Sequence, residues 1–126
     1  MKELLYTGWI CESQNEPDAI YLVGGNFPSD EWLIEDLVDE MAGHECSVNY
    51  WVCDEQCSPN EAQEAFLKKV MGATDGRFSI NWSEITGYLW TDEELNVGGH
   101  DLAQEIRSNI RKWLILEVTV HDKTSA

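Results

Sequence analysis

The apolar residues of this chain fall into short runs and into helix-like spacings, and the first two runs predict β-strands. Residues 4–10 and 19–23 are rich in apolar, aromatic and β-branched side chains, as strands are. The segment between them is polar and contains Pro17, which favours a loop. We therefore expect the two strands to form an antiparallel pair.

Further runs predict the rest of the sheet. Residues 47–53 are expected to form a strand, and residues 78–82 a short strand or an ordered loop. A short aromatic strand is expected to begin at Ile85. The run from Trp113 to Val120 is apolar at every position of its first half, which indicates a strand buried on both faces at the centre of the sheet.

Helical spacing appears first after Pro28. Ser29 is expected to cap the N-terminus of this helix, with acids in the first turn, and Gly43 to end it. The apolar residues that share one face of the helix are Leu33, Ile34, Leu37, Val38 and Met41. This spacing predicts an amphipathic helix packed on the sheet.

A second helix has the clearest start signal in the chain. Ser58 and Glu61 have the spacing of a capping box, and Pro59 suits the first helical position. The apolar residues expected to form its buried stripe are Ala62, Ala65, Phe66, Leu67 and Val70. Gly72 is expected to end the helix.

A third helix is expected near residues 101–111, with Asp101 as its N-cap. Strands and helices alternate irregularly, which favours an α+β fold with about three helices packed on a mainly antiparallel sheet. At 126 residues, 43% of them hydrophobic, the chain is expected to form one domain spanning residues 1–126. Its polar tail begins at about residue 121.

The chain is strongly acidic, with a net charge of -16. No lysine or arginine occurs between Glu3 and Leu67. Such a charge disfavours direct binding to nucleic acid or to anionic membranes, because both would be repelled. A basic protein surface is the partner that this charge favours, although acidity that serves only solubility explains the composition equally well.

Carboxylates gather on the polar face of the first helix. They are Asp30, Glu31, Glu35, Asp36, Asp39 and Glu40. Acids four residues apart repel each other by about 0.2–0.5 kcal/mol per pair, and no nearby cation in the sequence offsets this. We therefore interpret this face as a row of unpaired carboxylates that binds a basic partner, with Trp32 as an exposed aromatic anchor.

Four cysteines, Cys11, Cys46, Cys53 and Cys57, allow either two disulfides or four reduced thiols. Without a secretion signal we expect reduced thiols. Zinc is disfavoured, because Cys46 and Cys53 are seven residues apart on one predicted strand and so point to opposite faces. We expect no metal and no cofactor.

The sequence contains no recognisable catalytic motif, and we expect a protein that is not an enzyme. The Gly98-Gly99 corner could offer backbone N–H groups to an anion, but Asp101 competes for that position as an N-cap. His100 and Asp101 are adjacent in the sequence and lack a nucleophile nearby. No apolar run is long enough to span a membrane, so we expect the protein to stay in the cytoplasm of the cell that makes it.

The segment from Glu84 to Leu95, with Val97 to Leu102 and Leu114 to Glu117, resembles a group of small phage and prophage proteins. The resemblance covers the second half of the chain, from about Tyr50 onward. It implies no catalytic residues. It implies a protein made by a mobile element inside a bacterium, where small acidic inhibitors of host defence are common.

Charge and context together predict an anti-defence protein, most plausibly an anti-CRISPR-type inhibitor. It would bind a basic nucleic-acid-handling surface of a host effector through the acidic helix. A second acidic patch for this contact is formed by Asp92, Glu93 and Glu94.

Two alternatives stay open at this point. One is a sponge for a nucleotide second messenger, which would need Arg77, Arg107 and Arg111 to converge on a phosphate. The other is a phage regulatory or accessory protein whose acidic surface has no specific role. The sequence leaves open whether two copies associate as a homodimer through an edge strand.

Overall fold

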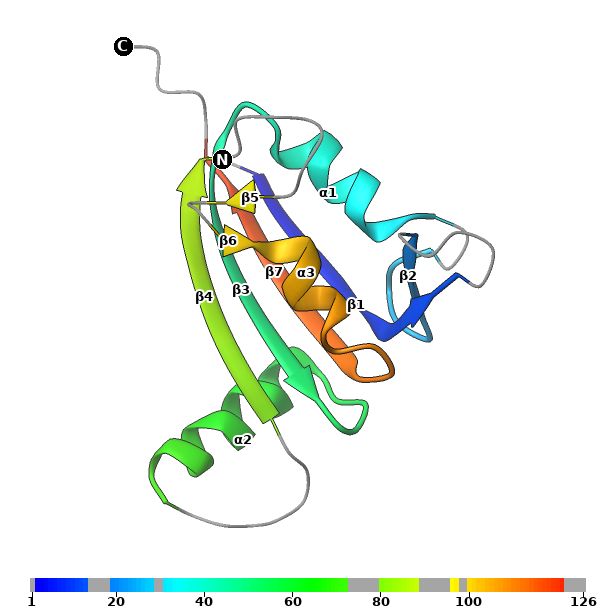
Figure 1. Ribbon diagram of the computed structural model, residues 1–126. Coiled ribbons are helices and arrows are strands. Elements are labelled where there is room, and N and C mark those ends of the chain that lie inside the picture. Colours follow the sequence, from blue (N-terminus) through cyan, green and yellow to red (C-terminus); the bar gives the residue numbers. More distant parts are fainter. Residues whose placement is uncertain are drawn as a thin grey trace.

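A five-stranded antiparallel sheet forms the centre of the computed structural model (Figure 1). The structure describes residues 2–13, 19–28, 31–72, 80–88, 96–97 and 100–121. The strands, in their spatial order, are β2 (Ile20–Val23), β1 (Lys2–Glu12), β7 (Trp113–Val120), β3 (Glu45–Cys53) and β4 (Ile80–Tyr88). The α+β fold predicted from the sequence is confirmed.

The central strand is β7, as its sequence predicts. All four residues from Trp113 to Leu116 are buried, because β7 is paired on both edges and covered on both faces. The predicted pair of strands at the start of the chain is also confirmed, with Ile10 opposite Leu22 in the register of β1 and β2.

The described residues form three helices, α1 (Leu33–Met41), α2 (Pro59–Val70) and α3 (Leu102–Arg107). They pack on the two opposite faces of the sheet. The first face packs against α1 and α3, through buried residues such as Leu37 and Ile106. The second face packs against α2, where a smaller cluster surrounds Trp113 and Ala62. Figure 1 shows α3 in front of the middle of the sheet, α1 toward β1 and β2, and α2 at one end of the sheet.

The first helix begins later than the sequence predicts. Its N-cap is Trp32, which makes no side-chain capping bond, so the prediction of Ser29 as the cap is wrong. The start is fixed instead by burial, because Leu33 and Leu37 are completely enclosed in the core. Ala42 and Gly43 follow its C-terminus, and Gly43 has a φ of 80°, which glycine adopts without strain.

The predicted capping box of α2 is confirmed. Glu61 N–H donates to Ser58 Oγ at 3.2 Å, and Ser58 N–H donates to the Glu61 carboxylate at 3.1 Å. The predicted buried stripe is only partly correct. Ala62 is buried, but Leu67 and Val70 are 60% and 67% exposed, because they lie beyond Phe66, the last residue of the helix that packs against the core.

The third helix is shorter than predicted, ending at Arg107 and not near residue 111. Asp101 caps it as expected, accepting a hydrogen bond from Gln104 N–H at 3.1 Å. After the helix, Arg111 has a φ of 75° and its N–H donates to Ile10 O at 2.7 Å. This bond ties the connection to β1 and ends the helix.

The strand β4 joins two stretches that the sequence treats as separate, since it runs continuously from Ile80 to Tyr88. A small ribbon of β5 (Asn96–Val97) and β6 (His100–Asp101) precedes α3, and the sequence does not predict it. Within the described parts of the chain, no helix is long and apolar enough to cross a membrane.

Candidate protein-binding surface and an adjacent cavity

The carboxylates of α1 fall into two groups with different environments. Asp36 accepts a hydrogen bond from the Tyr6 hydroxyl at 2.8 Å, and Glu40 forms an ion pair with Lys2 Nζ at 2.6 Å. Both acids flank the buried stripe of the helix and reach back to β1. The expectation of a row of unpaired carboxylates is therefore wrong for these two residues.

The second group comprises Glu35 and Asp39 on α1 together with Glu31, which lies just before the N-cap Trp32, and all three are exposed. We call these three residues the acidic ridge. The opposite side of α1 is buried in the core, so the ridge points away from the protein. Glu35 and Asp39 lie four residues apart, and the last turn of α1 contains no basic residue. Repulsion between these carboxylates is therefore not offset within the helix.

Trp32 is half-buried and does not stand out from the surface as predicted. Its ring packs edge-on against Tyr21, with centroids 6.3 Å apart. Among the tryptophans that the structure describes, Trp82 is the exposed one, at 37%. The predicted contact residues Asp30, Asp92, Glu93 and Glu94 lie outside the described residues, as does the Gly98-Gly99 corner.

Two tyrosines fix the helices of the first face through carboxylates. Tyr6 donates to Asp36 on α1, and Tyr50 donates to Glu105 on α3 at 2.9 Å. Burial, followed by the hydrogen bond to Asp36, raises the pKa of Tyr6 well above its usual value. The Tyr6 hydroxyl therefore stays protonated and remains a donor, which keeps the base of the acidic ridge in place.

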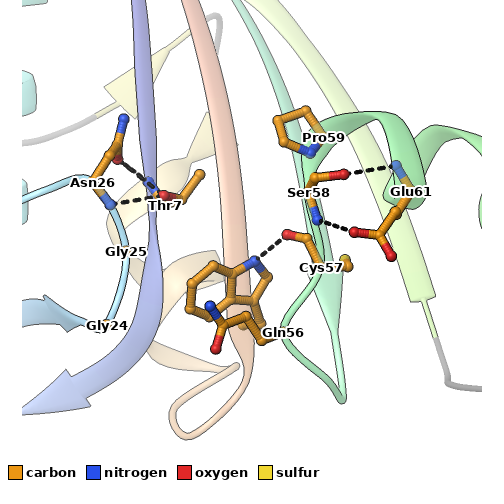
Figure 2. A pocket seen from close by; sticks show the side chains of 10 residues that line it. Thr7, Gly24, Gly25, Asn26, Gln56, Cys57, Ser58, Pro59 and Glu61 are labelled. Carbon is orange, nitrogen blue, oxygen red and sulfur yellow. Dashed lines mark hydrogen bonds between the residues drawn. The ribbon is translucent and has the colours of Figure 1, made fainter.

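A cavity of about 710 Å³ lies on the second face, beside the N-terminus of α2 (Figure 2). One wall is the Gly24-Gly25-Asn26 turn with Thr7, and the opposite wall is the segment leading into α2. Its lining residues are Thr7, Gly24, Gly25, Asn26, Gln56, Cys57, Ser58, Pro59, Glu61 and Trp113.

The turn that forms one wall is held tightly against β1. Any Cβ at Gly25 would lie only 1.9 Å from Thr7 O, so only glycine fits there. Asn26 Oδ1 accepts from Thr7 N–H and from the Thr7 hydroxyl, while its Nδ2 donates to Leu5 O. The polar groups of this wall are thus already bonded to each other.

Polar groups of the opposite wall are also hydrogen-bonded within the protein. Trp113 Nε1 donates to Cys57 O at 2.9 Å, and Ser58 and Glu61 bond each other in the capping box. Glu61 is the one charged residue among those lining the cavity. A carboxylate repels phosphate groups, and no lysine or arginine lines the cavity, so this cavity gives no support to a nucleotide sponge.

The cations that a sponge needs are not gathered at this cavity. Arg107 lies on α3, which packs on the first face, whereas the cavity lies on the second. Arg111 is exposed in the turn after α3. Arg77 lies outside the described residues.

All four cysteines are free thiols, of which Cys46, Cys53 and Cys57 are buried and Cys11 is half-buried. Cys46 lies in the core of the first face and Cys53 in that of the second, which confirms that they point to opposite sides of β3. Burial raises the pKa of Cys46 to about 11 and the pKa of Cys53 further still. Cys57 Sγ lies 3.4 Å from Cys53 Sγ, and burial also raises its pKa. These buried thiols are poor nucleophiles at neutral pH.

No group of three or more metal-ligating side chains occurs in the part of the chain that the structure describes. Asp101 is engaged as the cap of α3, while His100 is exposed on β6. The two residues therefore do not form the acid–base pair that their adjacency suggests.

The sequence does not predict two surface features, the cavity and the exposed apolar end of α2. Both features arise between elements that are far apart in the chain, and no local sequence pattern predicts them. The Gly24-Gly25-Asn26 triplet marks the turn at the cavity but not the empty space beside it.

Comparison with known proteins gives no relative: no family model, no curated protein and no solved structure matches the chain.

Proposed function

We propose that this chain is a non-catalytic inhibitor made by a phage or another mobile element. Its acidic ridge would occupy a basic, nucleic-acid-handling surface of a host defence protein, as an anti-CRISPR-type inhibitor does. The observation that carries this proposal is the acidic ridge itself. Glu35 and Asp39 stand exposed on a helix whose other side is fixed in the core, and Glu31 is exposed just before that helix begins.

The energetics of α1 support a role in binding. A helix gains stability from basic residues in its last turn, yet α1 has acids there and elsewhere on its exposed side. A basic partner would relieve the repulsion between Glu35 and Asp39 on binding. The net charge of -16 would further attract such a partner over long range.

The surroundings of the ridge favour a role in binding over a role in catalysis. Tyr6 and Lys2 bind Asp36 and Glu40 at its base, so the helix that carries the ridge is tied to β1 before it meets a partner. Rigid surfaces lose less entropy on association. The buried thiols and the anion-repelling cavity offer no competing reactive site in the described structure.

The first test is a pull-down from bacterial lysate, with the captured proteins identified by mass spectrometry. A basic nuclease or effector subunit is the expected result. Affinity for the purified target should fall as salt rises, because salt screens exposed charges. Binding that is independent of salt would contradict the proposal.

The decisive test reverses the ridge charges with Glu31→Lys, Glu35→Lys and Asp39→Lys together. We expect affinity for the target to fall by roughly tenfold to a hundredfold, measured by calorimetry. The matched control reverses three exposed acids that lie on neither α1 nor β4, which are Glu3, Glu45 and Glu55.

Both triple variants change the net charge equally, so their comparison separates position from total charge. A control that retains affinity assigns binding to the ridge. Equal losses in both variants would show that diffuse charge is responsible, and full affinity in the ridge variant would refute the proposal.

A further inference from the structure

The second helix extends beyond the sheet that supports it. Ala62 is completely buried, and one turn later Phe66 is partly buried with its ring 5.4 Å from that of Trp82 on β4. One turn further, Val70 is 67% exposed. Burial along this side of α2 therefore ends where the helix passes β4, the last strand of the sheet. Figure 1 shows the C-terminal end of α2 lying beyond β4.

The exposed end of α2 is strongly apolar. Leu67, Val70 and Met71 are 60%, 67% and 83% exposed, and we call these three residues the α2 overhang. Trp82 lies next to Phe66 and is itself partly exposed. Exposed apolar residues that form a contiguous group mark an interaction surface more often than scattered ones do.

The strand beneath the overhang has an open edge. In the described structure, β4 pairs with β3 along nine residue pairs and no strand pairs with its other side. Proteins usually protect such edges with charged side chains, proline or bulges, yet Ile80–Tyr88 contains no proline, lysine or arginine and only one charged residue, Glu84. A strand added to β4 would satisfy the open backbone groups and lie beneath the α2 overhang.

We propose that the occupant is a second copy of this chain, with the two β4 strands paired antiparallel about a twofold axis. The two sheets would then form one continuous sheet, and both α2 helices would lie on the same face of it. Their overhangs would meet across the axis. One surface thus serves both copies, as a twofold interface requires.

The charges of α2 fit this arrangement. Exposed acids lie in its first half, at Glu61 and Glu64, and exposed lysines lie near its end, at Lys68 and Lys69. Antiparallel helices place the lysines of one copy nearest the acids of the other. Within one copy, Lys68 Nζ already lies 3.6 Å from the Glu64 carboxylate, so the second copy would extend this pairing across the axis. In a chain with a net charge of -16, this pattern lowers the repulsion between two copies at the end of α2.

The test is sedimentation of the full chain over a wide range of concentrations. We expect a monomer–dimer equilibrium. The double variant Leu67→Glu/Val70→Glu should raise the dimer dissociation constant at least about tenfold. The control Leu5→Glu/Val23→Glu adds the same charge at exposed apolar positions of β1 and β2, and it should leave the dissociation constant within about threefold of the wild-type value.

Hydrogen exchange locates the contact independently. Alternate amides of β4 should lose protection on dilution to the monomer, while those bonded to β3 stay protected. Circular dichroism confirms that the variants fold. A wild-type chain that is monomeric at every concentration, even if another protein binds β4, would overturn this inference. A dimer unaffected by the Leu67/Val70 variant would overturn it as well.

Discussion

The helices α1 and α2 are both amphipathic, but they use their apolar residues in opposite ways. Each of the apolar positions on α1 is buried or nearly so, and its exposed side is acidic. Only Ala62 is fully buried on α2, and its C-terminal end exposes apolar residues. The helix with the stronger start signal is therefore the less buried one. A capping motif determines where a helix begins, but the sheet beneath it determines what it buries.

The largest predicted effect comes from comparing one leucine of each helix. Leu37→Ala should lower the free energy of unfolding by about 2–5 kcal/mol, because the side chain is completely enclosed. Leu67→Ala should change it by less than about 0.5 kcal/mol in the monomer, because that side chain is mostly exposed. Urea unfolding at low protein concentration measures both. Similar losses would mean that α2 has a core that the structure does not show.

The next effect concerns the attachment of α1 to the sheet. Tyr6→Phe removes the hydrogen bond to Asp36 and should cost about 1–2 kcal/mol, since bonds to charged acceptors contribute more than neutral ones. Urea unfolding at neutral pH gives the value. Asp36→Asn is the matched variant, because it keeps the shape of the acceptor without its charge. A cost below about 0.3 kcal/mol for both would show that α1 is held by apolar contacts alone.

The raised pKa of Tyr6 also predicts the direction in which the stability of the fold changes with pH. The folded state raises the pKa of Tyr6 above 10.0, so it keeps a proton that the unfolded chain releases. The contribution to stability is complete below pH 10 and is lost as pH rises above it. Tyr6→Phe should therefore lose less stability than the wild type between neutral and strongly alkaline pH. An identical alkaline decline in both proteins would contradict this assignment.

A smaller effect is expected at the start of α2. Ser58→Ala removes the acceptor for Glu61 N–H and should cost about 1 kcal/mol. Ser58→Thr, which keeps the hydroxyl, should recover most of that loss. The cost should appear as faster exchange of the first amides of α2, because little burial supports this helix. No change in exchange would show that tertiary contacts, and not the cap, hold its N-terminus.

The sequence predicts the strands, the central position of β7 and the cap of α2, because these depend on residues close together in the chain. It does not predict the start of α1, where burial of Leu33 overrides the cap expected at Ser29. Nor does it predict that Asp36 and Glu40 find partners on β1. Those contacts join residues more than 25 positions apart, so no local pattern contains them. Glu35 and Asp39 are predicted because helix periodicity alone places them opposite the core, whereas Glu31 precedes the helix.

The smallest expected effect bears most directly on why the ridge exists. Asp39→Lys would remove the repulsion with Glu35 and place a cation in the last turn of α1, where the helix dipole favours it. We expect a gain of about 0.5 kcal/mol in the free energy of unfolding at low salt, shrinking as salt rises. Glu35→Lys is the contrasting variant, because it relieves the same repulsion but puts a cation in the first turn, where the dipole opposes it. If Asp39→Lys stabilises the fold while weakening target binding, the native aspartate is retained at a cost to stability, which solubility at this position does not require. If the variant is no more stable than the wild type, the ridge carries no such cost, and the energetic support for its role in binding is lost.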